Sequence, residues 1–584
     1  MIIDVNEMME KPWYRTYPEG LRQQLKTYTL PEIPVFKLLE STAKYYPEST
    51  AVVYEPENFI VNSRDLLLLC ARFGAGLQQR FGVKKGDRVA FYSRNYPELI
   101  VAFFGVAMAG GIYVACNPLL IKEELLYQLE DSKATIIIAS DDMIPVLEEI
   151  VEEKGIDLES VIVFNRDKEL KQPLLGGASK TYAPPFYSYS DVFSDSPLEK
   201  PDINPGKDLI AIMYTSGTTS YPKGVLVTHG NVVSSSIIYG TVYTGKFPEQ
   251  DEEGFLKFTN DEKDLSMEWD FPFRHGIDGV LSVPPWTHMM GFLGQMIYPI
   301  MSAMTIFPMP VFNIDDMLRM IKKWKIAFAG GAPQMIATLL ARPDIDQQDI
   351  SSIRAWTAGG APVPVALGEA FEKRIGGVIS EAWTLTEAVM VSTKNYANKS
   401  GFRKWGSVGI PLPFTDLKIV DAQQGKREMP VNEEGELIQR GPTVALGYLN
   451  RPEDTQEAFR DGWLFTGDLG TLDENGFFYI TGRKKELIKY KGYNIAPRML
   501  EEILYKHPAV TMCAAVGKKD PAVGEIPIAF IQLKEGADIT PEELMAFVNG
   551  QVAPYKKLRE VRIVGTMPLL ATGKLNRREL NKLV

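Results

Sequence analysis

The fold is decided by residues 87–140, which read DRVAFYSRNYPELIVAFFGVAMAGGIYVACNPLLIKEELLYQLEDSKATIIIAS. Short apolar runs in this stretch predict strands, and two longer runs between them predict helices. In chain order these strands and helices are 87–93, 97–110, 112–116, 123–132 and 134–140. Strands that alternate with helices of this length form right-handed βαβ units with a mostly parallel sheet. We therefore expect an α/β protein whose large N-terminal domain contains mostly parallel sheets and helices.

One apolar stretch, Leu99–Cys116, is uncharged and almost long enough to span a bilayer. The pair Gly110-Gly111 interrupts it, and the Ile-Tyr-Val that follows is typical of a strand. We interpret the stretch as a buried helix, a turn and a buried strand rather than a transmembrane segment. The first residues, MIIDVNEMMEKPW, have no basic start and no apolar core of the kind that a secretory signal needs.

The composition is that of an ordinary globular protein. The 584 residues include 63 basic and 74 acidic side chains, and the formal net charge is −11. Such a surface does not neutralise phosphates well, which argues against nucleic acid as a partner. Cys70, Cys116 and Cys513 are too widely spaced for a disulfide framework and fit a reducing compartment, so we expect a cytoplasmic protein. The four histidines are not closely paired, which argues against a zinc site.

The chain changes character near Gly482. A basic run there is followed by a predicted helix, two strands and the capping box Thr540-Pro541-Glu542-Glu543 at the start of another helix. We predict an N-terminal domain of residues 1–482 and a small mobile C-terminal α+β domain of residues 483–584, with the hinge at 483–485.

Two irregular stretches interrupt the first domain. Residues 165–206 are rich in Pro, Gly and Ser and predict a surface loop. Residues 244–276 are rich in acidic and aromatic side chains. We interpret them as a solvated surface excursion, with a lid near the substrate as the alternative.

The strongest local motif lies at 214–225, YTSGTTSYPKGV, at the end of an apolar strand. A turn dense in hydroxyl groups presents many backbone N–H and side-chain O–H donors to an anion, and a lysine adds positive charge. The order Pro-Lys-Gly differs from that of a Walker A loop. The phosphate-binding candidates are Thr215, Ser216, Gly217, Thr218, Thr219 and Lys223.

This motif resembles the phosphate-binding signature of the adenylate-forming (AMP-binding) superfamily, which includes acyl-CoA synthetases, aryl-CoA ligases, luciferases and peptide-synthetase adenylation domains. Seven further segments resemble that family's motifs in the family's order: PWTHMMG at 285–291, AGGAP at 358–362, WTLTE at 383–387, GWLFTGD at 462–468, GRKKE at 482–486, KGYNIAP at 491–497 and PLLATGK at 568–574. The resemblance implies an acid–thiol ligase that uses ATP and Mg²⁺ to form an acyl-adenylate and then transfers the acyl group to coenzyme A.

The resemblance also implies which residues bind the nucleotide. They are Gly360, Ala361 and Pro362 along the adenine, Trp383 stacked on it, Asp468 at the ribose and Arg483 nearby. A carboxylate suits the ribose because its two oxygens match two adjacent hydroxyls.

The same resemblance implies a catalytic set of Lys574, Thr386, Glu387 and His288. In it, Thr386 contacts phosphate and Glu387 holds Mg²⁺, a hard ion usually bound by one or two carboxylates plus substrate phosphates. Lys574 neutralises charge that grows at phosphorus, and His288 gates the acyl site.

For the second half-reaction, the resemblance implies a rotation of the small domain about Lys485 that brings coenzyme A to Gly492 and Tyr493. Two positions depart from the family pattern, because Ser220 and Thr384 stand where glycine is usual. Thr384 adds bulk beside the acyl site, and Ser220 stiffens the phosphate loop.

The predicted acyl pocket contains Trp286, Met289 and Gly331, which are apolar or small. Neither 286–291 nor 358–362 contains an acidic residue that would receive an amino acid's ammonium group. The KPW opening and the NPLL turn at Asn117 resemble medium- and long-chain fatty-acid CoA ligases, so a fatty acid is the predicted substrate.

Other functions share these motifs. The alternatives are an aryl or alicyclic carboxylate CoA ligase, a fatty acyl-AMP ligase, a luciferase-like monooxygenase and a non-catalytic nucleotide-binding sensor. A hydrophobic substrate is compatible with peripheral membrane contact, and no oligomeric state is predicted.

Overall fold

The computed structural model describes residues 5–153, 158–165, 181–215, 222–266, 268–359, 363–491, 493–569 and 575–584. The alternation predicted for residues 87–140 is confirmed. It forms β3 (Arg88–Tyr92), α5 (Pro97–Ala109), β4 (Ile112–Cys116), α6 (Lys122–Ser132) and β5 (Ile136–Ser140). Helix α5 ends at Gly110, which has φ 88, a backbone conformation that glycine adopts without strain. Every residue of α5 and β4 is buried.

These strands belong to a seven-stranded sheet in the order β7-β6-β5-β3-β4-β8-β9. All its neighbouring strands are parallel except β8 and β9, which form an antiparallel pair. The remaining members are β6 (Ser160–Phe164), β7 (Phe186–Ser188), β8 (Leu209–Tyr214) and β9 (Gly224–Thr228). Helices α4 (Ser63–Phe81) and α7 (Ile144–Val151) accompany it. Because β8 and β9 are neighbours, the phosphate-loop motif between them connects two adjacent strand ends.

A nine-stranded sheet has the order β18-β17-β16-β15-β14-β12-β13-β1-β2. Its central strands are parallel and its outermost pairs are antiparallel. The strands are β1 (Thr50–Tyr54), β2 (Phe59–Asn62), β12 (Gly279–Ser282), β13 (Thr305–Pro308), β14 (Phe328–Gly331), β15 (Ala355–Ala358), β16 (Val378–Leu385), β17 (Met390–Lys394) and β18 (Ile410–Pro411).

The buried helix α8 (His229–Thr244) contacts β9 of the seven-stranded sheet and β17 of the nine-stranded sheet. Since it lies between two sheets, nearly all of its side chains are buried. The other helices of this domain are α1 (Val5–Met9), α2 (Glu19–Leu25), α3 (Phe36–Tyr45), α10 (Met289–Phe292), α11 (Tyr298–Met301), α12 (Ile314–Trp324), α13 (Pro333–Leu340), α14 (Val365–Ile375) and α15 (Pro452–Ala458).

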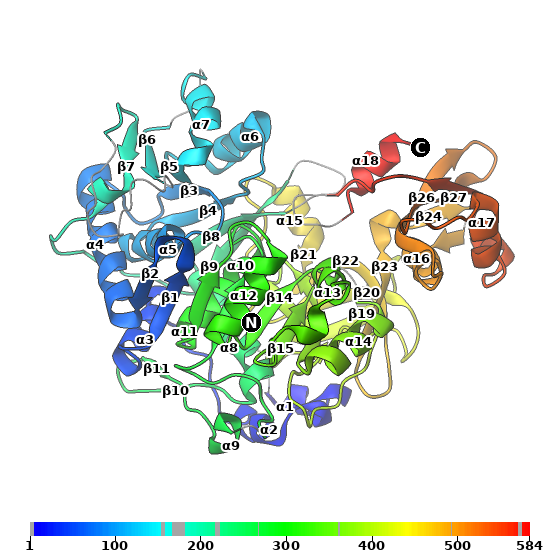
Figure 1. Ribbon diagram of the computed structural model, residues 1–584, viewed down its shortest axis with the longest axis horizontal. Coiled ribbons are helices and arrows are strands. Elements are labelled where there is room, and N and C mark those ends of the chain that lie inside the picture. The colour runs from blue at the N-terminus through cyan, green and yellow to red at the C-terminus, as the bar shows by residue number, and fades with distance from the viewer. Residues whose placement is uncertain are drawn as a thin grey trace.

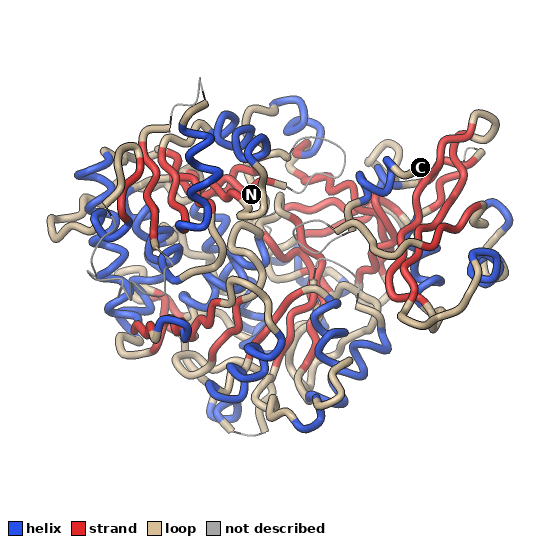
Figure 2. Tube along the Cα trace, turned by 45° about the horizontal axis from the view of Figure 1, so that its top comes forward, coloured by secondary structure: helices blue, strands red, loops and turns tan. Residues whose placement is uncertain are grey.

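A third sheet is antiparallel and completes the large domain. Its strands are β19 (Asp416–Val420), β20 (Gly435–Arg440), β21 (Phe459–Arg460), β22 (Trp463–Leu472) and β23 (Phe478–Arg483). Figure 2 shows strands in the interior of the molecule, with helices around them. Strand β23 leads from the third sheet into the C-terminal part of the chain (Figure 1).

The C-terminal part has its own cores and projects as a separate lobe, orange to red in Figure 1. Its elements are β24 (Ile488–Tyr490), β25 (Tyr493–Ile495), α16 (Pro497–Tyr505), β26 (Val510–Asp520), β27 (Gly524–Leu533), α17 (Pro541–Asn549), β28 (Glu560–Ile563) and α18 (Arg577–Lys582). The predicted capping box is present at Thr540, whose hydroxyl accepts from the Glu543 amide. The α+β character expected of this part is confirmed.

The stretch 244–276 is only partly a solvated excursion. It contains β10 (Glu249–Gln250), β11 (Leu256–Lys257) and α9 (Glu262–Leu265), with exposed acidic side chains. Its apolar side chains are packed into the core: Phe247, Leu256, Phe258, Trp269 and Phe273. In Figure 1 α9 lies beside α2, and β10 and β11 lie near α3, on the side of the molecule away from the C-terminal lobe. The alternative, a lid near the substrate, stays a prediction.

The described helices include none that is both long enough and apolar enough to cross a membrane. The Leu99–Cys116 stretch is instead split between α5 and β4, as expected.

Candidate functional site

Residues of several predicted motifs lie where parallel strands of the nine-stranded sheet end. Gly331 ends β14, Ala358 ends β15, and Glu387 follows β16 by two residues. In open α/β sheets, ligands bind outside the carboxyl ends of the strands. The topology therefore brings the separate motifs to one edge.

Asp468 is the centre of a polar cluster that joins three strands. Only 3 % of this residue is exposed. Its Oδ2 accepts a hydrogen bond from Trp383 Nε1 of β16 at 2.7 Å, and its Oδ1 is paired with Arg483 Nε of β23 at 2.8 Å. The Asp468 carboxylate raises the pKa of the Arg483 guanidinium, so this cation persists at every working pH.

The Asp468 carboxylate retains capacity for a ligand. A carboxylate offers about four acceptor positions. Trp383 and Arg483 use one on each oxygen, so each oxygen can still accept from one hydroxyl. The arrangement fits a vicinal diol, with an indole ring beside it and a cation at the mouth.

Glu387 is oriented by a neighbour that the motifs did not indicate. Its Oε1 accepts from the Tyr448 hydroxyl at 2.7 Å, and its carbonyl accepts from the Ala445 amide at 2.9 Å. Burial, followed by the charge of Glu387, raises the pKa of Tyr448 well above its usual value. Tyr448 therefore stays a neutral donor and holds one carboxylate oxygen in place.

The backbone just after Glu387 is strained. Val389 has φ 44 and Met390 has φ 93, a region that non-glycine residues seldom occupy. Such strain persists only where the surroundings enforce it, and it concentrates at functional sites.

Lys223 lies beside the same tyrosine. Its Nζ is 5.0 Å from the centre of the Tyr448 ring and 2.5 Å from Asp454 Oδ1. Tyr448 and Asp454 belong to the segment GYLNRPED, residues 447–454, which pairs with β9 through Val225 and Tyr448. The Pro-Glu-Asp start of α15 was the sequence signal that could have drawn attention to this segment.

The two ends of the phosphate-loop motif are joined. The Thr215 amide donates to the Lys223 carbonyl at 3.0 Å, and the Lys223 amide donates to Thr215 Oγ1 at 3.3 Å. The loop is therefore closed at its base. The following predicted site residues lie outside the described residues: Ser216, Gly217, Thr218, Thr219, Ser220, Gly360, Ala361, Pro362, Gly492 and Lys574.

The predicted acyl-site residues have structural roles. His288 precedes α10, where its Nδ1 accepts from the Met290 amide at 3.3 Å. Trp286 is 2 % exposed, and its indole donates to Ser282 Oγ at 2.9 Å. Met289 is also buried, and Gly331 lies against Met335, whose Sδ would be 2.2 Å from a Cβ at residue 331. These contacts fix Trp286 in place, whereas Met335 is a flexible side chain.

The remaining predicted residues lie toward the C-terminal lobe. Lys485 is in the short 3-10 turn Lys484–Glu486 that connects β23 and β24. Tyr493 is exposed and stacks on Tyr555 with ring centres 4.5 Å apart. Thr386 is half-buried just before Glu387.

A metal held only by protein ligands is not indicated. Over the part of the chain that the structure describes, no three His, Cys, Asp or Glu side chains are grouped for a metal ion. The single carboxylate of Glu387, held at one oxygen by Tyr448, fits an Mg²⁺ that takes its other ligands from water and substrate phosphates.

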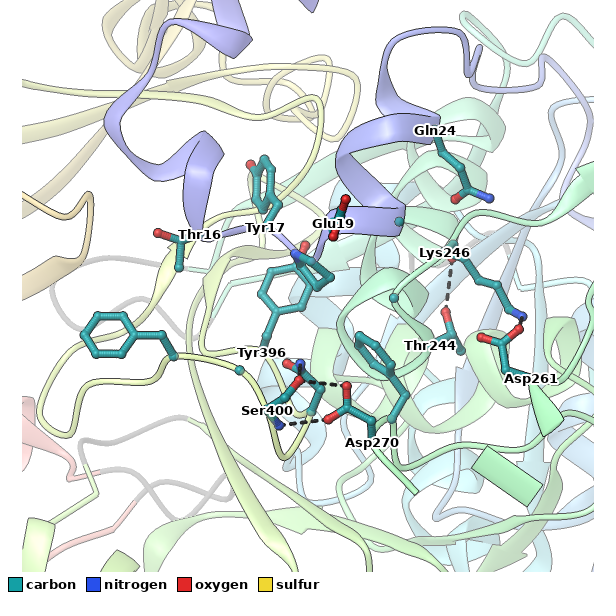
Figure 3. Close-up of a pocket in the computed structure, with 17 residues that line it drawn as sticks. Thr16, Tyr17, Glu19, Gln24, Thr244, Lys246, Asp261, Asp270, Tyr396 and Ser400 are labelled. Atoms are coloured by element: carbon teal, nitrogen blue, oxygen red, sulfur yellow. Dashed lines mark hydrogen bonds and ion pairs between the residues drawn. The ribbon is translucent and has the colours of Figure 1, made fainter. Parts of the chain in front are cut away.

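A cavity of about 550 Å³ lies elsewhere, between the N-terminal segment, the end of α8 and the loop after β17 (Figure 3). Asp270 bonds Ser400 at its rim, and Lys246 pairs with Asp261. None of the predicted site residues lines this cavity. It is separate from the edge of the sheet where those residues gather.

Comparisons with known proteins agree with the geometry. Residues 39–449 match the model of the AMP-binding enzyme family, and residues 499–574 match that of the AMP-binding enzyme C-terminal domain. The chain is 33% identical to a long-chain-fatty-acid–CoA ligase of Bacillus subtilis (strain 168), over 98% of each chain. It is 30% identical to a 4-coumarate–CoA ligase of Vanilla planifolia, and this match covers 88% of this chain and 87% of that protein.

Two solved structures extend the comparison. The anthranilate CoA ligase AuaEII in complex with anthranoyl-AMP has a TM-score of 0.79 at 25% identity, covering 96% of this chain and 98% of that one. The o-succinylbenzoate CoA synthetase MenE from Bacillus subtilis, in complex with its acyl-adenylate, has a TM-score of 0.73 at 26% identity, covering 94% and 98%.

Proposed function

Because the chain belongs to the AMP-binding enzyme family and is an acid–thiol ligase, we propose that its acid substrate is a medium- or long-chain fatty acid. Its general activity is that of an adenylate-forming acyl- or aryl-CoA ligase that uses ATP and coenzyme A. The single observation that carries the assignment of an ATP-using ligase is that Trp383 and Arg483 both contact Asp468, where the nucleotide's ribose is expected.

In the first half-reaction the acid's carboxylate attacks the α-phosphorus of ATP, and pyrophosphate leaves. Two anions must meet, so positive charge and donors at the phosphates lower the barrier. Asp468 and Trp383 hold the ribose and adenine. Mg²⁺, when bound at Glu387, neutralises phosphate charge, and Tyr448 keeps that carboxylate oriented. Lys223 and, on the family's pattern, Lys574 add charge at the phosphates.

In the second half-reaction the coenzyme A thiol attacks the acyl carbon, and AMP leaves. We propose that the C-terminal lobe turns about Lys485, with residues 483–485 as the hinge and the domain boundary. The 3-10 turn that contains Lys485 is short and buries none of its residues, which suits a hinge at the end of β23. Gly492 and Tyr493 would then meet the pantetheine arm.

A fatty acid is favoured by the apolar surroundings of Trp286, Met289 and Gly331 and by the full-length similarity to a long-chain-fatty-acid ligase. An aryl acid is the second candidate, because the hydroxyls of two buried tyrosines, Tyr239 and Tyr243, contact Thr357, which pairs with Gly330 in the sheet. Three buried free thiols fit the reducing cytoplasm, where we place the enzyme.

The test is AMP release with ATP, Mg²⁺ and a panel of straight-chain, aryl and alicyclic acids, each with and without coenzyme A. We expect release that depends on coenzyme A and peaks within one range of straight-chain acids. A peak among the aryl or alicyclic acids would replace the fatty acid by the second candidate. Release that ignores coenzyme A would indicate an acyl-AMP ligase instead.

A further inference from the structure

Lys394, at the end of β17, is a buried cation that the mechanism above does not use. It is completely buried, although lysine is seldom buried unless it is paired. Its Nζ donates to the Ser380 carbonyl at 3.1 Å and lies 5.7 and 5.6 Å from the ring centres of Tyr239 and Tyr243. Burial lowers its pKa to about 7, and the charge of Glu381, which forms no direct ion pair with it among the described residues, opposes that shift.

Strand register places Lys394 on the face of the hairpin away from the nucleotide residues. Lys394 is paired with Ala382 and Thr393 with Trp383. Because neighbouring side chains in a strand alternate between faces, Lys394 and Trp383 lie on opposite faces. Trp383 contacts Asp468, whereas Lys394 contacts the tyrosines of α8.

A continuous path of contacts links Lys394 to the predicted acyl pocket. The hydroxyls of Tyr239 and Tyr243 lie 3.4 and 2.5 Å from Thr357 Oγ1 on β15. The Thr357 carbonyl would be 3.0 Å from a Cβ at Gly330, the residue before Gly331. Gln295 Nε2 also donates to the Gly330 carbonyl, at 3.3 Å. The interior beyond Gly330 therefore contains hydroxyl and amide groups among its apolar side chains.

The wall of this region has an unusual backbone. Residues Leu293–Ile297, which follow α10, form a π-helical turn, a rare element that is frequent at functional sites. A Cβ at Gly294 of this turn would be 2.6 Å from Met390 Cε and 3.4 Å from the Tyr239 hydroxyl. Flexible Met390 therefore occupies the space beside Tyr239, and a ligand can displace a thioether side chain at low cost.

A second buried polar group lies on the same side of α8. Ser235, Tyr239 and Tyr243 are spaced four residues apart, so they share one stripe of the helix. Ser235 is 5 % exposed, and its Oγ has no hydrogen-bond partner within the described ranges. A buried hydroxyl without a partner costs free energy, and so does a buried ammonium group whose three N–H donors have one acceptor among the described residues. An oxygen acceptor from a ligand would relieve both.

We infer that Lys394 and Ser235 bind an oxygen at the far end of the acid, either a second carboxylate or a hydroxyl group. The inference rests on the proposed function, because it assigns the tail of the acid whose first carboxylate is adenylated. Lys394 is a recognition residue here and takes no part in the bond changes. The preferred substrate is therefore a fatty acid oxidised at its distal end rather than a plain one.

The test compares kcat/KM for plain straight-chain acids with that for ω-carboxylated and ω-hydroxylated acids of the same length. The K394M variant keeps the length of the side chain but removes the cation. We expect the wild type to prefer one distally oxidised series and K394M to lose about tenfold or more of that preference through KM, the size of a charge-assisted hydrogen bond. Plain acids should be activated as well by K394M as by the wild type, and the S235A variant should weaken the same preference.

The controls separate this inference from the proposed function. K399M removes a lysine that lies over Trp269, 3.9 Å from its ring centre, and should leave the preference unchanged. A thermal unfolding transition should show that K394M is folded at the assay temperature, although the variant removes the charge that acts on buried Glu381. An equal effect of K394M on plain and oxidised acids, or no effect, would overturn the role of Lys394 while leaving the fatty-acid ligase intact. No AMP release with any straight-chain acid would overturn both.

Discussion

Replacing Tyr448 by phenylalanine removes the side-chain donor that, within the described ranges, orients Glu387. The lost bond is 2.7 Å long and its acceptor is a carboxylate. Hydrogen bonds to charged groups contribute about 1.5–3 kcal/mol, and the half-buried setting of Tyr448 favours the lower end. Since about 1.4 kcal/mol corresponds to a tenfold change, kcat/KM for MgATP in adenylation should fall about tenfold.

The assay is ATP–pyrophosphate exchange at a series of Mg²⁺ concentrations. In Y448F the Mg²⁺ concentration for half-maximal exchange should rise, whereas thioester formation from supplied acyl-adenylate should be unchanged. The matched control is Y45F, which removes a tyrosine hydroxyl from Asp251 at 2.6 Å on the remote N-terminal side of the molecule. Its exchange rate should equal that of the wild type.

A double variant decides whether Tyr448 acts through Glu387. E387Q alone should cost about 10²–10³ in exchange rate. If Tyr448 only positions Glu387, the Y448F/E387Q variant should be no slower than E387Q, because coupled residues are not additive. Fully additive losses would refute the reasoning.

Three further outcomes are expected. K574A should lose about 10²–10³ of adenylation while it still converts supplied acyl-adenylate to thioester, measured in separate half-reaction assays; equal loss in both would contradict the assignment. K485P fixes one backbone dihedral at the hinge, so pyrophosphate exchange should persist and thioester formation should stop; normal thioester formation would exclude a pivot there. Burial raises the pKa of Glu381 from 4.5 to about 7, so the folded state holds a proton that the unfolded state has lost, and the free energy of unfolding should fall as pH rises through that interval. E381Q should reduce this fall in the free energy of unfolding, measured from urea unfolding curves at a series of pH values. An unchanged pH dependence would contradict the prediction.

The sequence predicted the βαβ alternation at residues 87–140 because each element there has its own period and ends at its own turn, such as Gly110. Motif order likewise indicated Trp383, Glu387 and Asp468 as site residues. It did not indicate Tyr448, because none of the motifs includes this tyrosine and its neighbours in sequence do not distinguish it from other tyrosines. The sequence also predicted that residues 244–276 are solvated, because they contain more acidic than aromatic side chains. In the structure several of those aromatic side chains pack into the core.

The sequence by itself determined the class of fold, the family and the order of the motifs, because these depend on neighbouring residues and on local periodicity. Only the tertiary structure decided which side chains meet. Trp383 and Asp468 are 85 positions apart, and Glu387 and Tyr448 are 61 apart. The same is true of Lys394, which is an ordinary polar residue in the chain. Strand register and the packing of α8 make it a buried cation, because a side chain's solvent and partners are set by distant segments.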